Sequence, residues 1–226
     1  MISKFSVAVA VVVGLASSVL ADGFFVGGQL GINFKPVKAE ENAKITYLGT
    51  YYTESDSKIT PFMGVKFGYD FDLWRAYGAF NYNSGTDYEY SSRTTTQYQN
   101  FEIDNESLDF VIGADWTPEI NSKFKIVVGP YVGYSVLNTD MSYTNSTSGI
   151  ISEFERTIRQ NGFVYGGKIG GIITFARRHE IDFGVKYDTV KYGDKDDIIV
   201  SSDISMNMKG IKRNSVGLYA GYNFKF

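Results

Sequence analysis

The sequence predicts an all-β protein, an eight-stranded antiparallel transmembrane β-barrel with short turns at one end and four long loops at the other. Three observations predict this fold. The composition is rich in aromatic residues that favour strands, with 17 Tyr and 17 Phe among 226 residues. Eight segments alternate apolar residues with polar residues or glycine. The links between these segments alternate between long and short.

The composition also excludes several classes of protein and site. Because the chain has no cysteine, it has no disulfide scaffold, thiol nucleophile or cysteine-based metal site. The single histidine, His179, excludes a multi-histidine metal site, and we expect no cofactor. The formal net charge of −3 gives no basic excess for nucleic-acid binding.

Residues 1–21 have the features of a cleaved secretory signal peptide. Lys4 supplies the positive charge before an apolar stretch over residues 5–15, and Val19 and Ala21 stand at positions −3 and −1 of a cleavage site before Asp22. Residues 17–18 are both serine and end the apolar run before it reaches the roughly 18 residues that a membrane-spanning helix needs. We therefore expect an exported chain whose barrel domain covers residues 22–226.

The eight predicted strands each present one wholly or largely apolar face. In residues 124–137, for example, Phe124, Ile126 and Val128 lie on one face, whereas Lys125 and Tyr131 lie on the other. The predicted strands cover residues 23–34, 59–71, 73–83, 107–116, 124–137, 163–175, 181–190 and 214–226.

Loop lengths decide between a soluble sandwich and a membrane barrel. The long links are residues 35–58, 84–104, 138–161 and 191–210, and the short links lie near 71–73, 117–123 and 176–180. A sandwich gives no reason for this alternation, whereas outer-membrane barrels have short turns at one end and long loops at the other. Aromatic residues also gather near both ends of the strands, as expected of the two interfacial girdles of such a barrel.

Two features depart from an ideal barrel pattern. Pro130 removes a hydrogen-bond donor inside a predicted strand, which predicts a bulge or a local irregularity there. The long links are rich in Thr, Tyr, Val and Ile, so we expect hairpins that extend beyond the membrane, and a ten-stranded barrel stays open as an alternative.

The end of the chain resembles the C-terminal assembly signal of bacterial outer-membrane barrels. Gly221, Phe224 and Phe226 match its pattern of a glycine followed by alternating aromatic residues, whereas Tyr219 stands where a polar residue is usual. The chain from residue 22 onward resembles the small OmpA/OmpX-type and opacity-type barrels of the porin family. This resemblance implies insertion by the barrel-assembly machinery with periplasmic chaperones, contact with outer-membrane lipids, extracellular loops and periplasmic termini. It implies no substrate and no active site.

Charged residues on the polar strand faces are predicted to fill the barrel lumen. An eight-stranded barrel is only wide enough for side chains to fill its interior. These residues form either a network of ion pairs that plugs the lumen or a narrow cation-lined path for small anions, since three lysines face one aspartate at mid-height. The mid-height residues are Lys66, Asp109, Lys168 and Lys186, and those nearer the short turns are Arg75, Lys125, Asp70, Asp115 and Asp182.

The sequence does not favour an enzyme. Enzymes that are built on outer-membrane barrels need a catalytic histidine with Ser, Asp or Glu partners near the outer rim. His179 falls in a short turn at the opposite end, where we expect an exposed residue. We therefore expect a non-enzymatic surface protein with a structural or adhesin-like role, binding a host or environmental ligand through its loops. Tyrosine-bearing stretches at residues 47–52 and 88–98 are either contacts for such a ligand or ordinary residues of the upper strands. A narrow porin-like diffusion channel for small solutes is the alternative.

Overall fold

The computed structural model describes residues 23–34, 38–39, 46–47, 50–51, 59–93, 97–147, 150–201, 204–208 and 210–226. The predicted signal peptide and its cleavage site at Ala21 and Asp22 lie outside these residues, so this part of the interpretation stays a prediction. Within the described ranges, no helix is long and apolar enough to cross a membrane.

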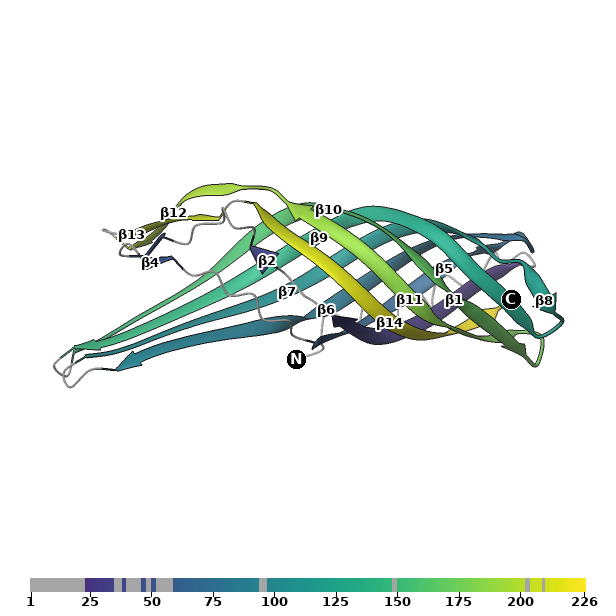
Figure 1. Ribbon diagram of the computed structural model, residues 1–226, viewed down its shortest axis with the longest axis horizontal. Coiled ribbons are helices and arrows are strands. Elements are labelled where there is room, and N and C mark those ends of the chain that lie inside the picture. Colours follow the sequence, from purple (N-terminus) through teal and green to yellow (C-terminus); the bar gives the residue numbers. More distant parts are fainter. Residues whose placement is uncertain are drawn as a thin grey trace.

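Eight antiparallel strands form a closed barrel, as the sequence predicts (Figure 1). Each strand pairs with its neighbours along the chain, and pairing of the first strand with the last closes the barrel. The ten-stranded alternative is therefore wrong. The barrel strands are β1 (Phe24–Phe34), β5 (Ile59–Asp70), β6 (Trp74–Arg93), β7 (Gln97–Trp116), β9 (Phe124–Thr147), β10 (Ile150–Phe175), β11 (His179–Tyr192) and β14 (Ile211–Lys225).

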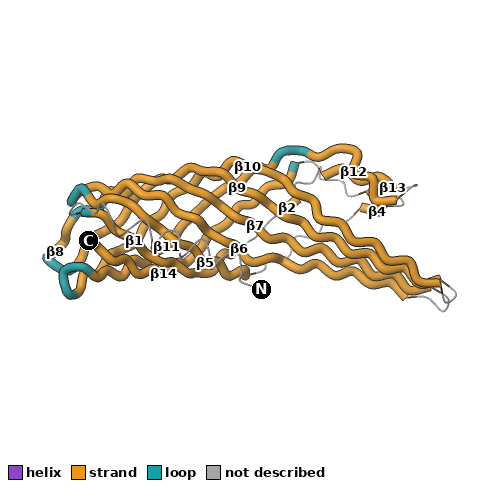
Figure 2. The backbone as a smooth tube through the Cα atoms, turned by 180° about the vertical axis from the view of Figure 1, so that it is seen from behind, coloured by secondary structure: helices purple, strands orange, loops and turns teal. Residues whose placement is uncertain are grey.

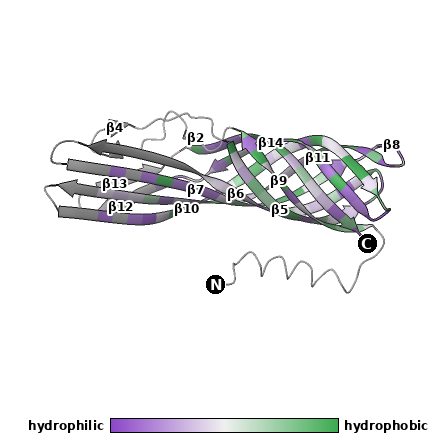
Figure 3. Cartoon of the chain, turned by 90° about the horizontal axis from the view of Figure 1, so that it is seen from below, coloured by the Kyte–Doolittle hydropathy of each residue, from purple (hydrophilic) through white to green (hydrophobic). Residues whose placement is uncertain are grey.

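The alternation of residues along each strand separates an apolar exterior from a packed interior. Outward-facing Leu30 and Ile169 are 66% and 59% exposed, whereas inward-facing Lys66 is only 3% exposed. Figure 3 shows the apolar positions along the barrel strands in green. Because the side-chain period of a strand is two, a register slip of one residue would turn the lysine outward and the leucine inward. The burial pattern thus fixes the register.

The strands are joined by tight connections at one end of the barrel, which we call the turn end. Asp72 adopts φ 68° between β5 and β6, and its amide donates to the Asp70 carboxylate at 2.9 Å. Ala176 and Arg177 adopt φ 51° and 60° between β10 and β11. Between β7 and β9, the short strand β8 (Glu119–Asn121) pairs with β9. The chain ends meet here too, since the amide of Phe226 donates to the carbonyl of Phe24 at 2.9 Å.

Four strands continue well beyond the barrel at the other end, which we call the hairpin end. Residues 84–93 of β6, 97–106 of β7, 138–147 of β9 and 150–161 of β10 form a four-stranded antiparallel sheet, the projecting sheet (Figure 2). The links 84–104 and 138–161 are thus mostly strand rather than loop. The alternation of side chains between the two faces continues from the barrel strands into these residues. Within each hairpin, the backbones of the two strands bond to each other.

Shorter strands accompany the projecting sheet at the hairpin end. Strand β12 (Lys195–Ser201) pairs with β13 (Ile204–Met208), and β3 (Thr46–Tyr47) pairs with β4 (Thr50–Tyr51). Strand β2 (Lys38–Ala39) extends the sheet beside β14. These strands belong to the links 35–58 and 191–210, which the sequence predicts to be long.

Pro130 interrupts one ladder without shifting it. The β7–β9 pairing passes from Gly113 opposite Tyr131 to Trp116 opposite Val128 in the same register, and the two positions between carry no assigned pair. On its other side, Pro130 pairs with Gly167 in an unbroken ladder. The expected irregularity is therefore a gap in one ladder and no bulge. A bulge does occur in strand β6, between Asn83 and Thr86, where this strand enters the projecting sheet.

Candidate functional site

The lumen near the turn end holds a four-residue cluster of charges. Arg75, which is 2% exposed, donates to the Asp70 carboxylate at 2.7 Å and to the Glu180 carboxylate at 2.8 Å. The Lys225 ammonium lies 2.8 Å from Asp70. Because the buried Arg75 and the partly exposed Lys225 meet two buried carboxylates, this level of the lumen is electrically balanced.

A second group of pairs fills the middle of the lumen. Lys66 forms an ion pair with Asp182, and Lys168 lies 2.8 Å from the Asp115 carboxylate. The Lys168 ammonium also lies 4.2 Å from the ring centroid of Tyr77. These carboxylates come from residues that the sequence places nearer the turn end, and they reach the mid-height lysines across the lumen.

A third group lies above these pairs, toward the hairpin end. Arg213 donates to Asp109 at 2.5 Å and lies 3.4 Å from Asp188. Lys186 lies 3.8 Å from the other oxygen of Asp188. The hydroxyl of Ser135 donates to Asp109 at 2.6 Å. Asp109 therefore bonds to one cation and one hydroxyl, and Asp188 lies between two cations.

The remaining predicted lumen residue lies at the mouth of the turn end. Lys125 pairs with Glu119 at 3.2 Å and donates to the Asp72 carbonyl at 3.3 Å. The Glu119 side chain is 62% exposed, so this pair faces solvent on one side. Solvent exposure makes it the weakest of the lumen pairs.

The structure brings each of the nine predicted lumen residues into an ion pair, but sequence reasoning missed several of their partners. The period-two pattern offered a signal for most of them: Glu180 and Asp188 share a strand face with Asp182, and Arg213 shares one with Ser215. The missed partners are Glu119, Glu180, Asp188, Arg213 and Lys225.

The described lumen is nearly full. One cavity of about 30 Å³ lies among Tyr77, Tyr131, Lys168 and Lys186, and another of about 20 Å³ lies near Arg213. Each has room for about one or two water molecules. Apolar side chains pack above the charges at the hairpin end, among them Leu137, Val164, Val190 and Ile211. Since each mid-height lysine also has a carboxylate partner, the described lumen lacks the lysine excess on which the anion-path interpretation depends.

His179 does not occupy the exposed turn that the sequence predicts for it. It is the first residue of β11 and is half-buried among aromatic rings. Its Nδ1 lies 2.5 Å from the Tyr222 hydroxyl, its ring stacks on Phe175 at 5.6 Å, and it meets the edge of Phe224 at 5.4 Å. The neighbouring Glu180 points into the lumen and pairs with Arg75. The contacts of His179 are thus those of a packing residue.

The residues of the predicted assembly signal lie along the strand that closes the barrel. In β14, Gly221 stands opposite Gln29 of β1, and a Cβ there would lie 3.0 Å from the carbonyl of Gly28. The rings of Phe224 and Phe226 meet edge to face at 5.1 Å. These positions fix the closing seam, and their role in assembly stays a prediction.

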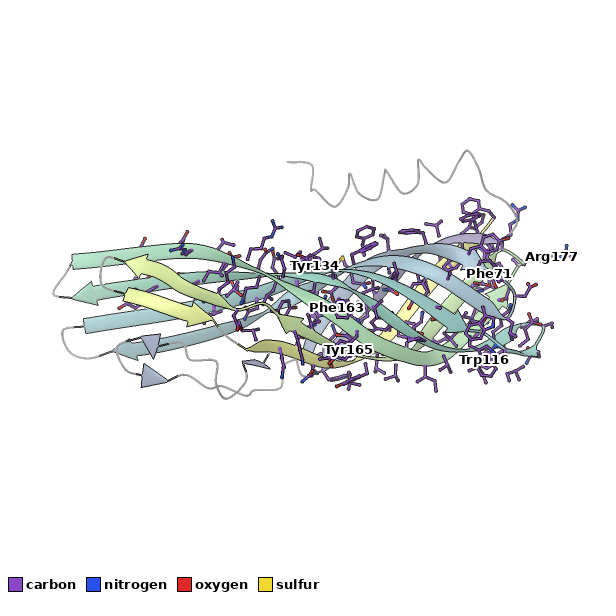
Figure 4. All side chains as sticks on the ribbon, turned by 90° about the horizontal axis from the view of Figure 1, so that it is seen from above. Phe71, Trp116, Tyr134, Phe163, Tyr165 and Arg177 are labelled. Atoms are coloured by element: carbon purple, nitrogen blue, oxygen red, sulfur yellow. The ribbon has the colours of Figure 1, made fainter. Side chains whose placement is uncertain are left out.

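Two groups of exposed aromatic side chains flank the barrel wall (Figure 4). At the hairpin end, Tyr134 and Phe163 stand opposite each other on β9 and β10. At the turn end, Trp74 and Trp116 stand opposite each other on β6 and β7. These are the positions that interfacial girdles occupy on a barrel surrounded by lipid.

The projecting sheet has two chemically different faces. The face continuous with the barrel exterior is acidic, and we define it by Glu102, Asp104, Asp140, Glu153 and Glu155. All of these except the half-buried Asp104 are exposed. The other face, which continues the lumen wall, carries Ile103, Met141, Tyr143 and Ile158 and also the exposed Arg156. Met141 and Ile158 are buried at its base. The two faces of this sheet therefore differ in charge and in polarity.

Comparisons with known proteins agree with this architecture. The family model described as "Outer membrane protein beta-barrel domain" matches residues 7–224. No curated protein matches the chain.

The chain is also similar to several solved structures of outer-membrane proteins. The attachment invasion locus protein Ail of Yersinia pestis shares 15% identity over 90% of this chain and 100% of its own, with a TM-score of 0.44. OprG from Pseudomonas aeruginosa shares 15% over 92% and 97%, with a TM-score of 0.46. The outer-membrane protease OmpT from Escherichia coli shares 10% over 92% and 99%, with a TM-score of 0.41. Sequence identity and structural similarity at this level assign no ligand and no activity to this chain.

Proposed function

Because the chain belongs to the outer-membrane protein β-barrel family, we propose that it is a non-enzymatic protein of the Gram-negative cell surface that binds external partners through its projecting sheet. In this proposal the turn end and both termini face the periplasm, and the hairpin end faces the medium. The apolar barrel wall lies in the outer-membrane lipid between the two aromatic girdles.

The observation that carries the proposal is the projecting sheet itself. Strands β6, β7, β9 and β10 continue beyond the barrel as a paired sheet rather than as irregular loops. Barrel closure does not require these residues, because the barrel strands already pair below them. A rigid sheet exposes side chains and backbone to a partner at a lower ordering cost than loops do.

The filled lumen supports a binding role over a transport role. Its described charges pair with one another, and the cavities found among the described residues at Tyr131 and at Arg213 hold about one or two water molecules each. The aromatic environment of His179 likewise offers packing rather than acid–base chemistry. The projecting sheet thus remains the part of the described chain best suited to act on other molecules.

The test is to remove the projecting sheet and keep the barrel. Thr86 stands opposite Asn105, and Thr139 opposite Ile158, so an Asn-Gly turn replacing residues 87–104 and another replacing 140–157 preserve both registers. We expect this shortened variant to reach the outer membrane in a heat-modifiable form. Cells that display it should lose adherence to polypeptide- and glycan-coated surfaces relative to cells with the full chain. Undiminished adherence at equal surface levels would overturn the proposal.

A further inference from the structure

The turn between β10 and β11 displays two arginines on a constrained backbone. Phe175 pairs with His179, so residues 176–178 connect the two strands. Ala176 and Arg177 adopt φ 51° and 60°, a left-handed conformation that glycine and asparagine adopt more readily than alanine or arginine. Within the turn, the Arg178 amide donates to the Ala176 carbonyl at 2.6 Å. The turn thus carries arginine side chains in a place where its backbone favours other residues.

Backbone hydrogen bonds hold this turn against two neighbouring parts of the barrel. On one side, the amide of Lys225 donates to the carbonyl of Arg178 at 2.8 Å. On the other side, the amide of Thr174 donates to the carbonyl of Lys123 at 2.8 Å, which places the turn before β9 beside the end of β10. Lys123, Arg177 and Arg178 therefore come from two adjacent turns that backbone contacts join.

We call Lys123, Arg177 and Arg178 the basic cluster. All three are exposed, and among the described residues none of them forms an ion pair. The buried carboxylates at this end of the lumen already pair with lumen cations, and the exposed Glu119 pairs with Lys125. Figure 4 shows Arg177 at the turn end, beyond the ends of the strands. Neighbouring cations repel one another, and an external anion relieves this repulsion.

Aromatic rings lie on the outer wall directly beside the basic cluster. The His179 ring stacks on Phe175 at 5.6 Å and meets the edge of Phe224 at 5.4 Å. Tyr222, whose hydroxyl lies 2.5 Å from Nδ1 of His179, is 44% exposed, as is Phe175. We call these four residues the aromatic platform. It belongs to the girdle at the turn end, the depth at which lipid headgroups meet acyl chains.

The two features together favour a lipid over a soluble acid. A soluble anion needs only the cations, whereas an anionic glycerophospholipid carries a phosphate directly next to apolar chains. The basic cluster and the aromatic platform lie side by side in the same order along the barrel wall. An arginine guanidinium donates two parallel hydrogen bonds to phosphate oxygens, and basic residues at a membrane surface attract anionic lipids.

We propose that the basic cluster and the aromatic platform bind an anionic glycerophospholipid of the leaflet that surrounds the turn end. The lipid phosphate lies against the three cations, and the glycerol and the first acyl carbons pack on the aromatic rings. In the proposed orientation this leaflet is the periplasmic one. The inference goes beyond the proposed function, because it concerns the opposite end of the barrel and does not depend on the projecting sheet.

The test uses the barrel domain, residues 22–226, folded in micelles of a neutral detergent and titrated with single lipids. Phosphatidylglycerol and cardiolipin are the anionic lipids, and phosphatidylcholine is the lipid without net charge. Native mass spectrometry measures the binding of the first lipid molecule, and heat-modifiable migration verifies that each variant is folded. Glycerol 3-phosphate and polyglutamate, added as soluble competitors, separate a lipid from a free phosphate and from an acidic polymer.

We expect phosphatidylglycerol and cardiolipin to bind at least ten-fold more tightly than phosphatidylcholine, with a preference that falls as salt rises. Each cation removed should weaken anionic lipid binding about five-fold. The variant Arg177→Asn/Arg178→Gln should therefore lose most of the preference, and asparagine suits the φ of residue 177. The matched control Arg159→Gln/Lys191→Gln removes two exposed cations at the hairpin end and should leave binding unchanged.

Four outcomes would overturn the inference. Equal binding of phosphatidylcholine and the anionic lipids would show no headgroup preference, and an equal loss in the hairpin-end control would place the lipid elsewhere. Displacement of the lipid by equimolar glycerol 3-phosphate would identify a site for free phosphate, and displacement by polyglutamate would identify one for a soluble acidic partner. The shortened variant of the preceding section keeps both features and should bind lipid as the full chain does, so its adherence tests the proposed function alone.

Discussion

At the scale of single residues, the lumen shows how buried charges are tolerated inside a narrow barrel. Arg213 is 3% exposed and reaches both Asp109 and Asp188. Burying a charge is costly unless opposite charges and hydrogen bonds satisfy it. The network therefore fixes the side chains in place, and its members depend on one another.

That dependence predicts the effect of removing one cation. Replacing Arg213 with Met leaves the Asp109 carboxylate buried with only neutral donors, so we expect the folded barrel to lose about 3–5 kcal/mol of stability against urea. Glu119→Gln, at the solvent-facing pair with Lys125, should cost only about 0–1 kcal/mol. The measurement is equilibrium urea unfolding in lipid vesicles. Equal losses in the two variants would contradict the interlocked network.

Sequence alone assigned nine charged residues to the lumen, but it missed Glu180, Asp188 and Arg213 and did not show which residues pair. The period-two pattern assigned Lys66 and Asp182 correctly to strand faces that point inward. Their pairing joins residues 116 positions apart, across the lumen rather than between neighbouring strands. Such a contact depends on the tilt and stagger of all the strands, which no local pattern encodes.

At the scale of elements, the prediction located all eight barrel strands but made four of them too short: the predicted β6 and β9 end too early, and the predicted β7 and β10 begin too late. The criterion was an apolar outward face, and it fails where β6, β7, β9 and β10 leave the barrel. There the outward residues become acidic, as at Glu102 and Asp140, while alternation with apolar residues such as Ile103 and Met141 continues. The Thr, Tyr, Val and Ile content of the long links, from which we expect hairpins beyond the membrane, is the sequence signal for this extension.

The strand that closes the barrel carries the prediction about assembly. Deleting Phe226, or replacing Gly221 with Glu, should lower the amount of heat-modifiable barrel several-fold while export to the periplasm stays intact. The deletion removes the terminal aromatic that resembles the assembly signal, and the substitution adds a side chain where a Cβ already lies 3.0 Å from the Gly28 carbonyl. Phe226→Tyr is the matched control and should assemble normally. Normal barrel levels in the deletion variant would count against the assembly-signal interpretation.

At the scale of the whole molecule, the proposed orientation is directly measurable because the chain has no cysteine. We expect Glu153→Cys, in the projecting sheet, to react with a membrane-impermeant maleimide on intact cells. Ser122→Cys, at the turn end, should react only after the outer membrane is permeabilised. Both positions are exposed, so a difference reports sidedness rather than burial. The reverse labelling pattern would show that the hairpin end faces the periplasm.

The filled lumen also predicts the electrical behaviour of the barrel. Reconstituted in planar bilayers, residues 22–226 should give no stable conductance steps, because paired side chains occupy the lumen. Insertion is verified separately by heat-modifiable migration. Steps whose anion selectivity falls when Lys66, Lys168 and Lys186 are replaced in turn would instead make the protein a narrow diffusion channel.

The seam between β1 and β14 determines when the molecule can first become a barrel. Phe25 pairs with Lys225, and Phe34 pairs with Val216, so closure joins the two ends of the barrel domain. Contacts between such distant positions form slowly because a long loop must be ordered first. Until they form, any sheet that the other strands build has two unpaired edges, and unpaired strand edges are prone to aggregate. Protection of these two edges therefore requires the last strand, and it cannot be complete before the whole barrel domain is present.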